Sequence, residues 1–321
     1  MTCVRPIIID TDPGQDDAIA IMLAVASPDE LDIRGIVAVA GNIELAHTQE
    51  NARKICQLAD PENKLSLKVY AGCAKPLARD LVTSRGFHGP TGLGGLTLPA
   101  PQLPLQQQSG VGFLVETLRS AQPRSVTICA LGPLTNIASA FSRDPTIAGA
   151  VREFVMMGGS YFEGGNVTPV AEFNVHVDPE AAQTVLHVLT SSRTPITMMP
   201  LDVTHKALST PPRIGHFRAL GNGCGTATAD LLAATGYDLS KRGWSGAPLH
   251  DPCVVAYLLE PGMFRGRDVN VEIATADPLT LGMTVVDWRG VTGRPPNVNY
   301  MTEVEADAYY RLLTERIARL P

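Results

Sequence analysis

Short apolar runs rich in Val and Ile alternate along most of this 321-residue chain with longer segments suited to packed helices. Buried strands are expected over 6–9, 31–39, 67–71, 125–130 and 153–157. Helices are expected over 16–26, 45–59, 111–121 and 134–141. Because continuous apolar strands between helices are typical of a sheet covered on both faces, the alternation predicts an α/β fold with a mostly parallel central sheet. Ligands of such sheets bind at the carboxyl ends of the strands, so the active site is expected there.

Two stretches interrupt the alternation, 73–104 and 204–249, and both are rich in Gly, Pro and Ser. Long loops or lids are expected over them, since functional loops are the usual reason for such length inside a compact domain. Beyond them, a hairpin over 268–275 and 281–286 and a terminal helix over 303–319 are expected. The length alone would allow about two domains of roughly 150 residues. No shift in composition marks a boundary, so we expect a single domain over 1–321.

Composition narrows the class of protein. With 45% hydrophobic and 18% charged residues, the chain is globular rather than disordered. The net charge of −6 argues against nucleic acid or a membrane surface as partner, because both require a basic face. The apolar run 18–26 is far shorter than the roughly 18 residues of a membrane span, and no cleavage site follows the first apolar stretch, so a cytoplasmic location is expected. Six scattered cysteines without a CxxC pair favour neither a disulfide framework nor a zinc ribbon.

Four carboxylates stand close together where the first expected strand ends. They are Asp10, Asp12, Asp16 and Asp17, in the segment Asp-Thr-Asp-Pro-Gly-Gln-Asp-Asp. Any one of them could be a turn or helix-start residue. Four together repel one another, and a cation relieves that repulsion best. Because no Cys or paired His accompanies them, the pattern predicts Ca²⁺ or Mg²⁺ rather than Zn²⁺.

A fifth acidic residue, Asp251, lies far along the chain between His250 and Pro252. Asp followed by Pro is typical of a helix start, with the Asp as N-cap and the Pro at the first helical position. A helix starting at a strand end would also bring Asp251 to the rim that carries the first cluster, with His250 beside it. The structural and functional interpretations of Asp251 are compatible.

A third element combines the Gly-rich segment 156–166 with the tetrapeptide Ala-Glu-Phe-Asn at 171–174. If the tetrapeptide is extended, Glu172 and Asn174 point to one face and Phe173 to the other. Together with Asn166 they would offer donors and acceptors suited to a polyhydroxylated ligand. The alternative is a loop held together by Asx turns.

In this order, six segments closely resemble the motifs of the inosine-uridine-preferring nucleoside hydrolase family. They are Asp10 to Ala18, Gly41-Asn42, Leu-Gly-Pro-Leu-Thr-Asn at 131–136, Met-Met-Gly-Gly at 156–159, Ala-Glu-Phe-Asn at 171–174 and His-Asp-Pro at 250–252. The resemblance runs from about Pro6 to the end of the helix after Asp251. It implies a Ca²⁺-dependent enzyme that splits ribonucleosides into ribose and free base for salvage or catabolism. It also implies a homodimer or homotetramer.

The resemblance assigns roles residue by residue. It implies Ca²⁺ ligands at Asp12, Asp17, Asp251 and the backbone carbonyl of Leu131. It implies that the substrate is held by Asp16, Asn42, Asn166, Glu172, Phe173, Asn174 and Asp251, with Met157 beneath the sugar. Asp12 matches the general base, and Asp10 supports the cluster from behind. His88 and His250 match two histidines of the inosine-uridine or pyrimidine-preferring group, and either could protonate the departing base.

Two other classes of protein stay open at this point. A haloacid-dehalogenase-like phosphatase also begins with a strand and Asp-x-Asp, but Pro13-Gly14 followed by Asp16-Asp17 fits its next motif poorly. A nucleoside or ribose-binding protein without turnover would keep the pocket but would tolerate the loss of Asp12 or His250, and both are present. The preference for purine or pyrimidine bases is also open, because base contacts would come from the two long loops.

Overall fold

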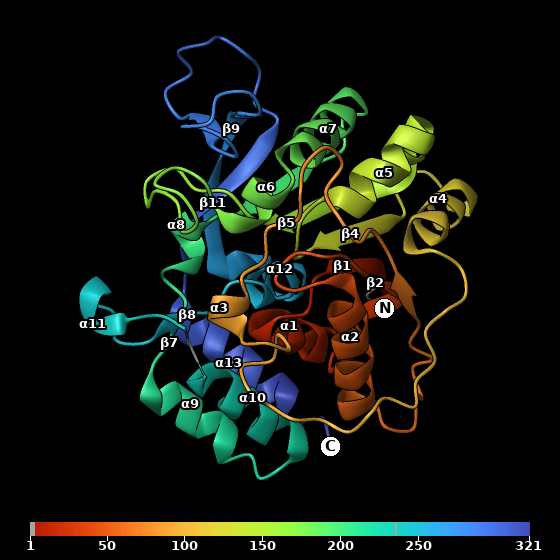
Figure 1. The fold of residues 1–321 in the computed structure, drawn as a ribbon, viewed down its shortest axis with the longest axis vertical. Coiled ribbons are helices and arrows are strands. Elements are labelled where there is room, and N and C mark those ends of the chain that lie inside the picture. Colours follow the sequence, from red (N-terminus) through yellow and green to blue (C-terminus); the bar gives the residue numbers. More distant parts are fainter. Residues whose placement is uncertain (1–3, 235) are drawn as a thin grey trace.

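The computed structural model describes residues 4–234 and 236–321, within which nine strands form one sheet in the order β10-β9-β11-β6-β5-β4-β1-β2-β3 (Figure 1). The strands are β1 (Arg5–Thr11), β2 (Leu31–Ala38), β3 (Val69–Ala71), β4 (Val126–Ala130), β5 (Val151–Met157), β6 (Ile196–Met199), β9 (Phe264–Ile273), β10 (Thr284–Asp287) and β11 (Val298–Val304). Strands β1 to β6 pair in parallel, and β11 continues this pattern beside β6. At one edge of this sheet, β9 pairs antiparallel with both β11 and β10. The sheet is therefore mostly parallel, as predicted.

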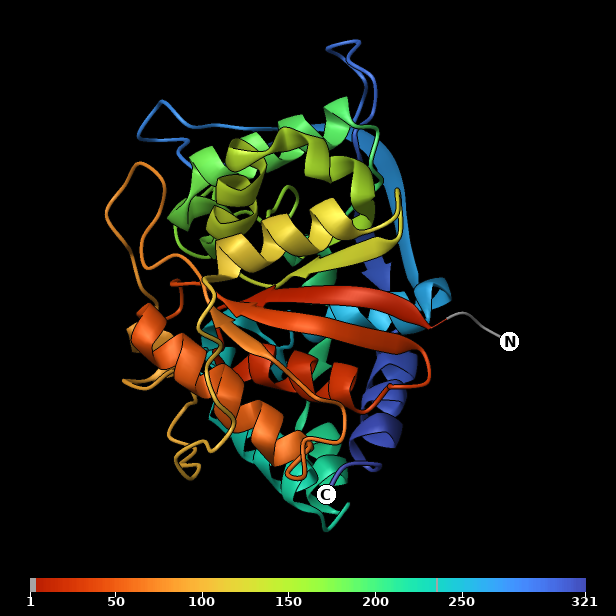
Figure 2. The ribbon, with the colours of Figure 1, turned by 90° about the vertical axis from the view of Figure 1, so that its right-hand side faces the viewer.

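Helices cover both faces of the sheet, which Figure 2 shows close to edge-on. One face packs against α4 (Gly110–Ser120), α5 (Thr135–Arg143) and α7 (Pro179–Ser191). The other packs against α1 (Gln15–Val25), α2 (Leu45–Ala59), α10 (Gly223–Ala233), α12 (Pro252–Leu259) and α13 (Ala306–Ile317). None of the helices in the described parts of the chain has the length and apolar character needed to cross a membrane.

Strand β1 illustrates how the sequence produces the two layers. Ile7 and Ile9 pack into the core on the α1 side, whereas Ile8 packs into the core on the α5 side, because successive side chains of a strand point to opposite faces. All three are fully buried, so the strand needs no polar position until Asp10. This explains why the first strand reads as an uninterrupted apolar run and why its carboxylates gather at one end.

The expectation of a long loop over 204–249 is wrong for much of its length. The segment contains α9 (Pro211–Arg218), α10 and α11 (Leu239–Arg242), together with a two-stranded sheet of β7 (Leu208–Ser209) and β8 (Ala247–Pro248). Its Pro and Gly residues mark helix ends instead: Pro211 begins α9, and Gly221, with a φ of +72°, lies in the turn that precedes α10. The stretch 73–104 is loop as expected, apart from the short α3 (Arg85–His88).

The C-terminal expectations hold with shifted boundaries. The hairpin is present as β9 and β10, which pair antiparallel. The last helix begins at Ala306 rather than 303, because 298–304 forms β11, which fills the place between β6 and β9.

Candidate active site

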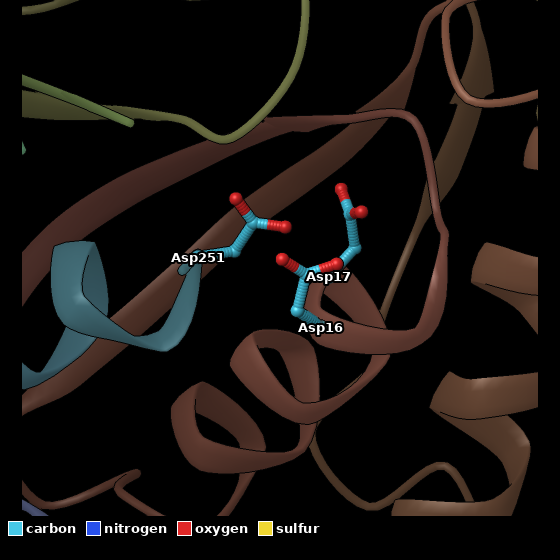
Figure 3. A group of neighbouring side chains, drawn as sticks. All are labelled: Asp16, Asp17 and Asp251. Atoms are coloured by element: carbon cyan, nitrogen blue, oxygen red, sulfur yellow. The ribbon is translucent and has the colours of Figure 1, made fainter. Parts of the chain in front are cut away.

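The acidic cluster lies where β1 ends and α1 begins. Asp10 is the residue before the last one of β1, Asp16 and Asp17 are in the first turn of α1, and Asp251 precedes the first residue of α12. Figure 3 shows the carboxylates of Asp16, Asp17 and Asp251 pointing toward one another, and one oxygen of each lies within 4.8 Å of the others. The predicted meeting of the two distant segments is therefore present.

The side chain of Asp17 is locked in place by its neighbours. Its Oδ1 accepts hydrogen bonds from Thr11 Oγ1 at 2.5 Å and from the Asp12 N–H at 3.1 Å. Its Oδ2 accepts from the Gly14 N–H at 3.0 Å and from Asn42 Nδ2 at 3.2 Å. Asp17 is the third residue of α1, and its carboxylate accepts from the N–H of the N-cap residue Gly14, as in a capping box. These bonds hold the Asp17 carboxylate toward the cluster.

Asp12 and Asp10 are fully buried and only half satisfied. Asp12 Oδ2 accepts from the Asn42 N–H at 2.7 Å, and Asp10 Oδ2 accepts from Asn136 Nδ2 at 2.8 Å. The Oδ1 atom of each has no hydrogen-bond partner among the described residues. Two glycines leave room for Asp12, since a Cβ at Gly41 or Gly132 would lie 2.2 or 2.1 Å from a carboxylate oxygen of Asp12.

Burial without counter-charge dominates the electrostatics of the cluster. It raises the pKa of Asp10 to about 8 and also raises the pKa values of Asp12, Asp17 and Asp251. The charge of Asp16 adds to the upward shift in pKa at Asp17 and Asp251. Unpaired buried carboxylate oxygens with no nitrogen or sulfur donor among them fit a hard divalent cation. The residues present therefore fit a hard divalent cation, and the three carboxylates with oxygens within 4.8 Å of one another include Asp16 and not the predicted ligand Asp12.

A cavity of about 220 Å³ opens beside the cluster. It is lined by Asp16, Asn42, Thr83, Ser84, Phe87, His88, Leu131, Met157, Asn166, Val167, Glu172, Phe173, Asn174, Tyr237, His250 and Asp251. Every predicted substrate-binding residue is among them. The predicted site residues outside this lining are Asp10, Asp12 and Asp17, all with fully buried side chains.

The tetrapeptide Ala-Glu-Phe-Asn is not extended as expected. Phe173 begins the helix α6 (Phe173–Val177), and Glu172 is its N-cap. The Glu172 carboxylate accepts from the N–H groups of Asn174 at 2.9 Å and Val175 at 3.3 Å, which satisfies the helix start, and from the Gly159 N–H at 3.0 Å. Glu172 therefore joins the Gly-rich segment to α6, and its burial raises its pKa to about 7.

Asn174 connects the cavity wall to the predicted carbonyl ligand. Its Nδ2 donates to the Leu131 carbonyl at 2.7 Å and to the Met157 carbonyl at 3.3 Å. A carbonyl oxygen has two lone pairs, so Leu131 can still accept or coordinate once more. Asn166 Oδ1 accepts from the Phe173 N–H at 2.9 Å, which ties the end of the Gly-rich loop to α6.

Asp251 begins α12 with Pro252 at the first helical position, as predicted, but its side chain makes no capping hydrogen bond within the described chain. It turns toward Asp16 and Asp17 instead (Figure 3). Asp251 is therefore the N-cap residue, as predicted, without a side-chain capping hydrogen bond, and it also lies on the expected rim.

Part of the cavity lining is aromatic, with Phe87 and Tyr237, and both predicted histidines belong to the lining. His250 is held at both ring nitrogens, with Nδ1 2.8 Å from Thr204 Oγ1 and Nε2 3.0 Å from Tyr237 Oη. Burial lowers the pKa of His250 well below its usual value and also lowers that of His88. Phe87 packs edge-on against Tyr237, with ring centroids 4.6 Å apart.

The sequence prediction missed five residues of this lining, namely Thr83, Ser84, Phe87, Val167 and Tyr237. Position next to His88 could have drawn attention to Phe87 and Ser84. Ser84 Oγ donates to Asn42 Oδ1 at 2.9 Å and so orients the Asn42 amide. Tyr237 carries no sequence signal, because it stands in a polar segment and reaches His250 only through the fold.

Known proteins share this architecture along the whole chain. Residues 7–311 match the family model described as inosine-uridine preferring nucleoside hydrolase. The pyrimidine-specific ribonucleoside hydrolase RihA of Enterobacter sp. (strain 638) is 42% identical over 316 residues, 98% of each chain. An uncharacterised protein of Schizosaccharomyces pombe is 46% identical over 316 residues, 98% of this chain and 99% of its own.

A solved structure has the same fold. The purine-preferring ribonucleoside hydrolase from Gardnerella vaginalis superposes with a TM-score of 0.87 at 28% identity over 98% of both chains. With the motifs, the cavity and these matches in agreement, the chain belongs to the inosine-uridine preferring nucleoside hydrolase family, whose members hydrolyse N-glycosyl bonds.

Proposed function

We propose that this enzyme hydrolyses pyrimidine ribonucleosides, uridine and cytidine first and inosine second, to ribose and free base, with Ca²⁺ as its metal. The observation that carries the proposal is the cluster of buried carboxylates beside a cavity lined by amides, carboxylates and two histidines. The preference for pyrimidines follows the RihA relatives, which are 42% identical, whereas the purine-preferring structural neighbour is 28% identical.

The metal would be held by Asp12, Asp17, Asp251 and the Leu131 carbonyl, with Asp16 beside it. Bound there, Ca²⁺ would supply positive charge that polarises ribose hydroxyls and a water molecule. The preference for Ca²⁺ over Mg²⁺ follows from the number of oxygen donors available, since Ca²⁺ accepts six to eight and Mg²⁺ demands near-octahedral geometry.

The sugar would be held by the polar wall. Asp16, Asn42 and Asn174 offer donors and acceptors to ribose hydroxyls, and Met157 offers an apolar surface beneath the ring. Hydrolysis of a ribosyl C–N bond passes through an oxocarbenium-like state, which these carboxylates stabilise by their negative charge. Asp12 accepts the proton of the attacking water, because its Oδ1 has no other partner within the described chain.

The departing base would leave on the aromatic side. Tyr237 Oη and His250 Nε2 form a hydrogen-bonded pair that opens onto the cavity, so a proton can move from this pair to the base as the bond breaks. His88 faces the same cavity from α3 and is the alternative donor.

The phosphatase alternative is disfavoured by charge. No Lys or Arg is among the described residues that line the cavity, whereas phosphoryl transfer requires cationic groups around the phosphate. A binding protein without turnover would have no use for a buried carboxylate with an unpaired oxygen, since such a group costs free energy.

Release of reducing sugar tests the proposal directly. Uridine, cytidine, inosine and p-nitrophenyl phosphate are offered to the enzyme with Ca²⁺ and, separately, with a chelator. We expect sugar release from uridine and cytidine that the chelator abolishes and that Ca²⁺ restores. Phosphate release, or tight ribose binding without turnover, would overturn it. We also propose that the enzyme is cytoplasmic, serves nucleoside salvage and is active as a homodimer or homotetramer.

A further inference from the structure

A buried carboxylate outside the acidic cluster holds one wall of the cavity. Asp202 lies in α8 (Leu201–Thr204), the short helix that follows β6, and is 3% exposed. Its Oδ2 accepts from the Tyr161 N–H at 2.9 Å, and its Oδ1 accepts from the N–H groups of Phe162 at 2.5 Å and Glu163 at 3.0 Å. Tyr300 Oη donates to Oδ2 at 2.5 Å. Four donors thus converge on this one carboxylate.

The same helix makes a second attachment to this run of backbone. His205, directly after α8, places Nδ1 3.0 Å from Glu163 Oε2. The Leu201 N–H also donates to the Gly159 carbonyl at 2.9 Å. Residues 159–163 are therefore fastened to α8 at both ends and in the middle.

Thr284 Oγ1 also bonds both backbone groups of Ser160, and the rings of Tyr161 and Phe162 lie against Trp288, but the backbone N–H groups of 161–163 all donate to Asp202. Tyr161 and Phe162 are 39% and 60% exposed, so their burial contributes little to its stability. A surface run with few buried apolar contacts opens easily unless its backbone groups are bound elsewhere. Charge-assisted bonds to a buried carboxylate are about twice as strong as neutral ones, so the Asp202 carboxylate is the main restraint.

The restrained run leads directly into the cavity wall. Asn166 and Val167, three and four residues beyond Glu163, line the cavity. At its far end this wall is tied to Ala171, whose carbonyl accepts from the N–H groups of Asn166 and Val167 at 3.2 and 3.3 Å. The position of the wall thus depends on its attachment at Ala171 and on its attachment at Asp202.

We propose that Asp202 is a positioning residue that fixes residues 161–163 and thereby holds Asn166 and Val167 against the bound substrate. The proposal rests on the proposed function, since it names what the wall contacts. Because the wall is in place before and during bond cleavage, its loss weakens ground-state and transition-state binding alike. Such a loss raises KM and leaves kcat nearly unchanged.

Asp202→Asn tests this, because it keeps the size of the side chain and replaces one acceptor by an NH₂ group facing N–H donors. We expect KM for uridine to rise by about tenfold or more, with kcat within about threefold of wild type. Hydrogen exchange of the metal-free protein should show faster exchange at the amides of 161–163, by about tenfold or more. Glu163→Gln removes the charge from the second attachment, which weakens it, and should raise KM by about threefold.

Asp60→Asn is the matched control. Asp60 accepts from the N–H groups of Lys64 and Leu65 at 3.0 and 2.8 Å in a loop that does not line the active cavity. Its loss should speed exchange in its own loop and leave KM for uridine unchanged. If Asp202→Asn does not fold, Glu163→Gln decides the matter through KM alone.

Unchanged exchange at 161–163, or a fall in kcat with KM unchanged, would overturn the assignment. So would equal effects of Asp202→Asn and Asp60→Asn on KM. A wild-type enzyme that cleaves no ribonucleoside would refute the proposed function and with it the substrate contact. Hydrogen exchange would then still report whether Asp202 restrains the wall, so the two failures are distinguishable.

Discussion

Asp10→Asn should stabilise the metal-free protein at neutral pH and do so less as the pH falls. Asp10 is fully buried, and its burial raises its pKa from 3.8 to about 8. Between these two values the folded protein keeps a proton that the unfolded chain has released. Stability therefore falls as pH rises through this window, which is the reverse of the usual behaviour of an ion-paired Asp. Asn keeps the shape and removes the titration.

The size of the effect follows from the width of the window. The pH interval from the ordinary pKa of 3.8 up to pH 7 lowers the free energy of unfolding by about 4 kcal/mol, at about 1.4 kcal/mol per pH unit. Relative to protonated Asp10, Asn lowers the free energy of unfolding by about 1–3 kcal/mol, because its NH₂ group replaces an oxygen that has no donor or acceptor nearby. The net gain at pH 7 is therefore about 1–3 kcal/mol. Between pH 5 and pH 7 the advantage of Asn should grow by about 3 kcal/mol, whatever the cost of the NH₂ group.

Urea unfolding of both proteins in chelator, at pH 5, 6 and 7, measures this difference. The two free energies of unfolding should diverge as pH rises, with the variant more stable at pH 7. With Ca²⁺ present the wild type should gain stability, since a cation favours the ionised cluster. Parallel pH profiles for the two proteins would refute the reasoning, because they would mean that Asp10 is ionised in the folded state throughout.

Three further predictions concern the site. Asp17→Ala should abolish stoichiometric Ca²⁺ binding, measured by elemental analysis, and hydrolysis with it; a variant that retains the metal and full turnover would contradict the ligand assignment. A 2′-deoxyribonucleoside should be cleaved as much as about 10⁴-fold less efficiently than its ribonucleoside, since it leaves polar groups of the site unpaired, and equal kcat/KM values would count against ribose recognition. His250→Ala should slow inosine by roughly 10² to 10⁴ but leave p-nitrophenyl riboside nearly unaffected, because that leaving group needs no proton. Equal losses on both substrates would assign His250 a structural role.

Local patterns predicted the parts of the fold in which neighbours in sequence decide the outcome. The helix over 45–59 has the predicted bounds, because its apolar residues recur at helical spacing. Strand β1 and its terminal carboxylates were equally visible, since an apolar run ending in Asp can be read without knowing its neighbours. The meeting of Asp251 with Asp17 was also predicted, although the strand before Asp251 is β8 of the separate two-stranded sheet and not one of the parallel strands on which the prediction relied.

Contacts that form only through tertiary packing could not be predicted from the sequence. Tyr237 contacts His250 through the fold of 236–250, a stretch whose Gly and Pro residues suggested a loop. Glu172 was expected in an extended segment, but its carboxylate accepts from the nearby N–H groups of Asn174 and Val175 and so begins a helix, while its side chain still lines the cavity. In both cases side-chain hydrogen bonding overrode the pattern, and single-sequence periodicity does not register such bonds.

Buried carboxylates of this protein differ in how many hydrogen bonds they receive, and the amino-acid sequence does not show this difference. Asp202 and Glu172 receive four and three hydrogen bonds, most of them from backbone N–H groups, so both carboxylates hold backbone in place. Asp10 and Asp12 each keep a buried oxygen without a partner among the described residues. A fold retains such a cost only where something outside the chain relieves it. Asp17 combines both features: it receives four hydrogen bonds and still meets Asp16 and Asp251, so a full set of donors fixes a carboxylate in place without removing it from the cluster.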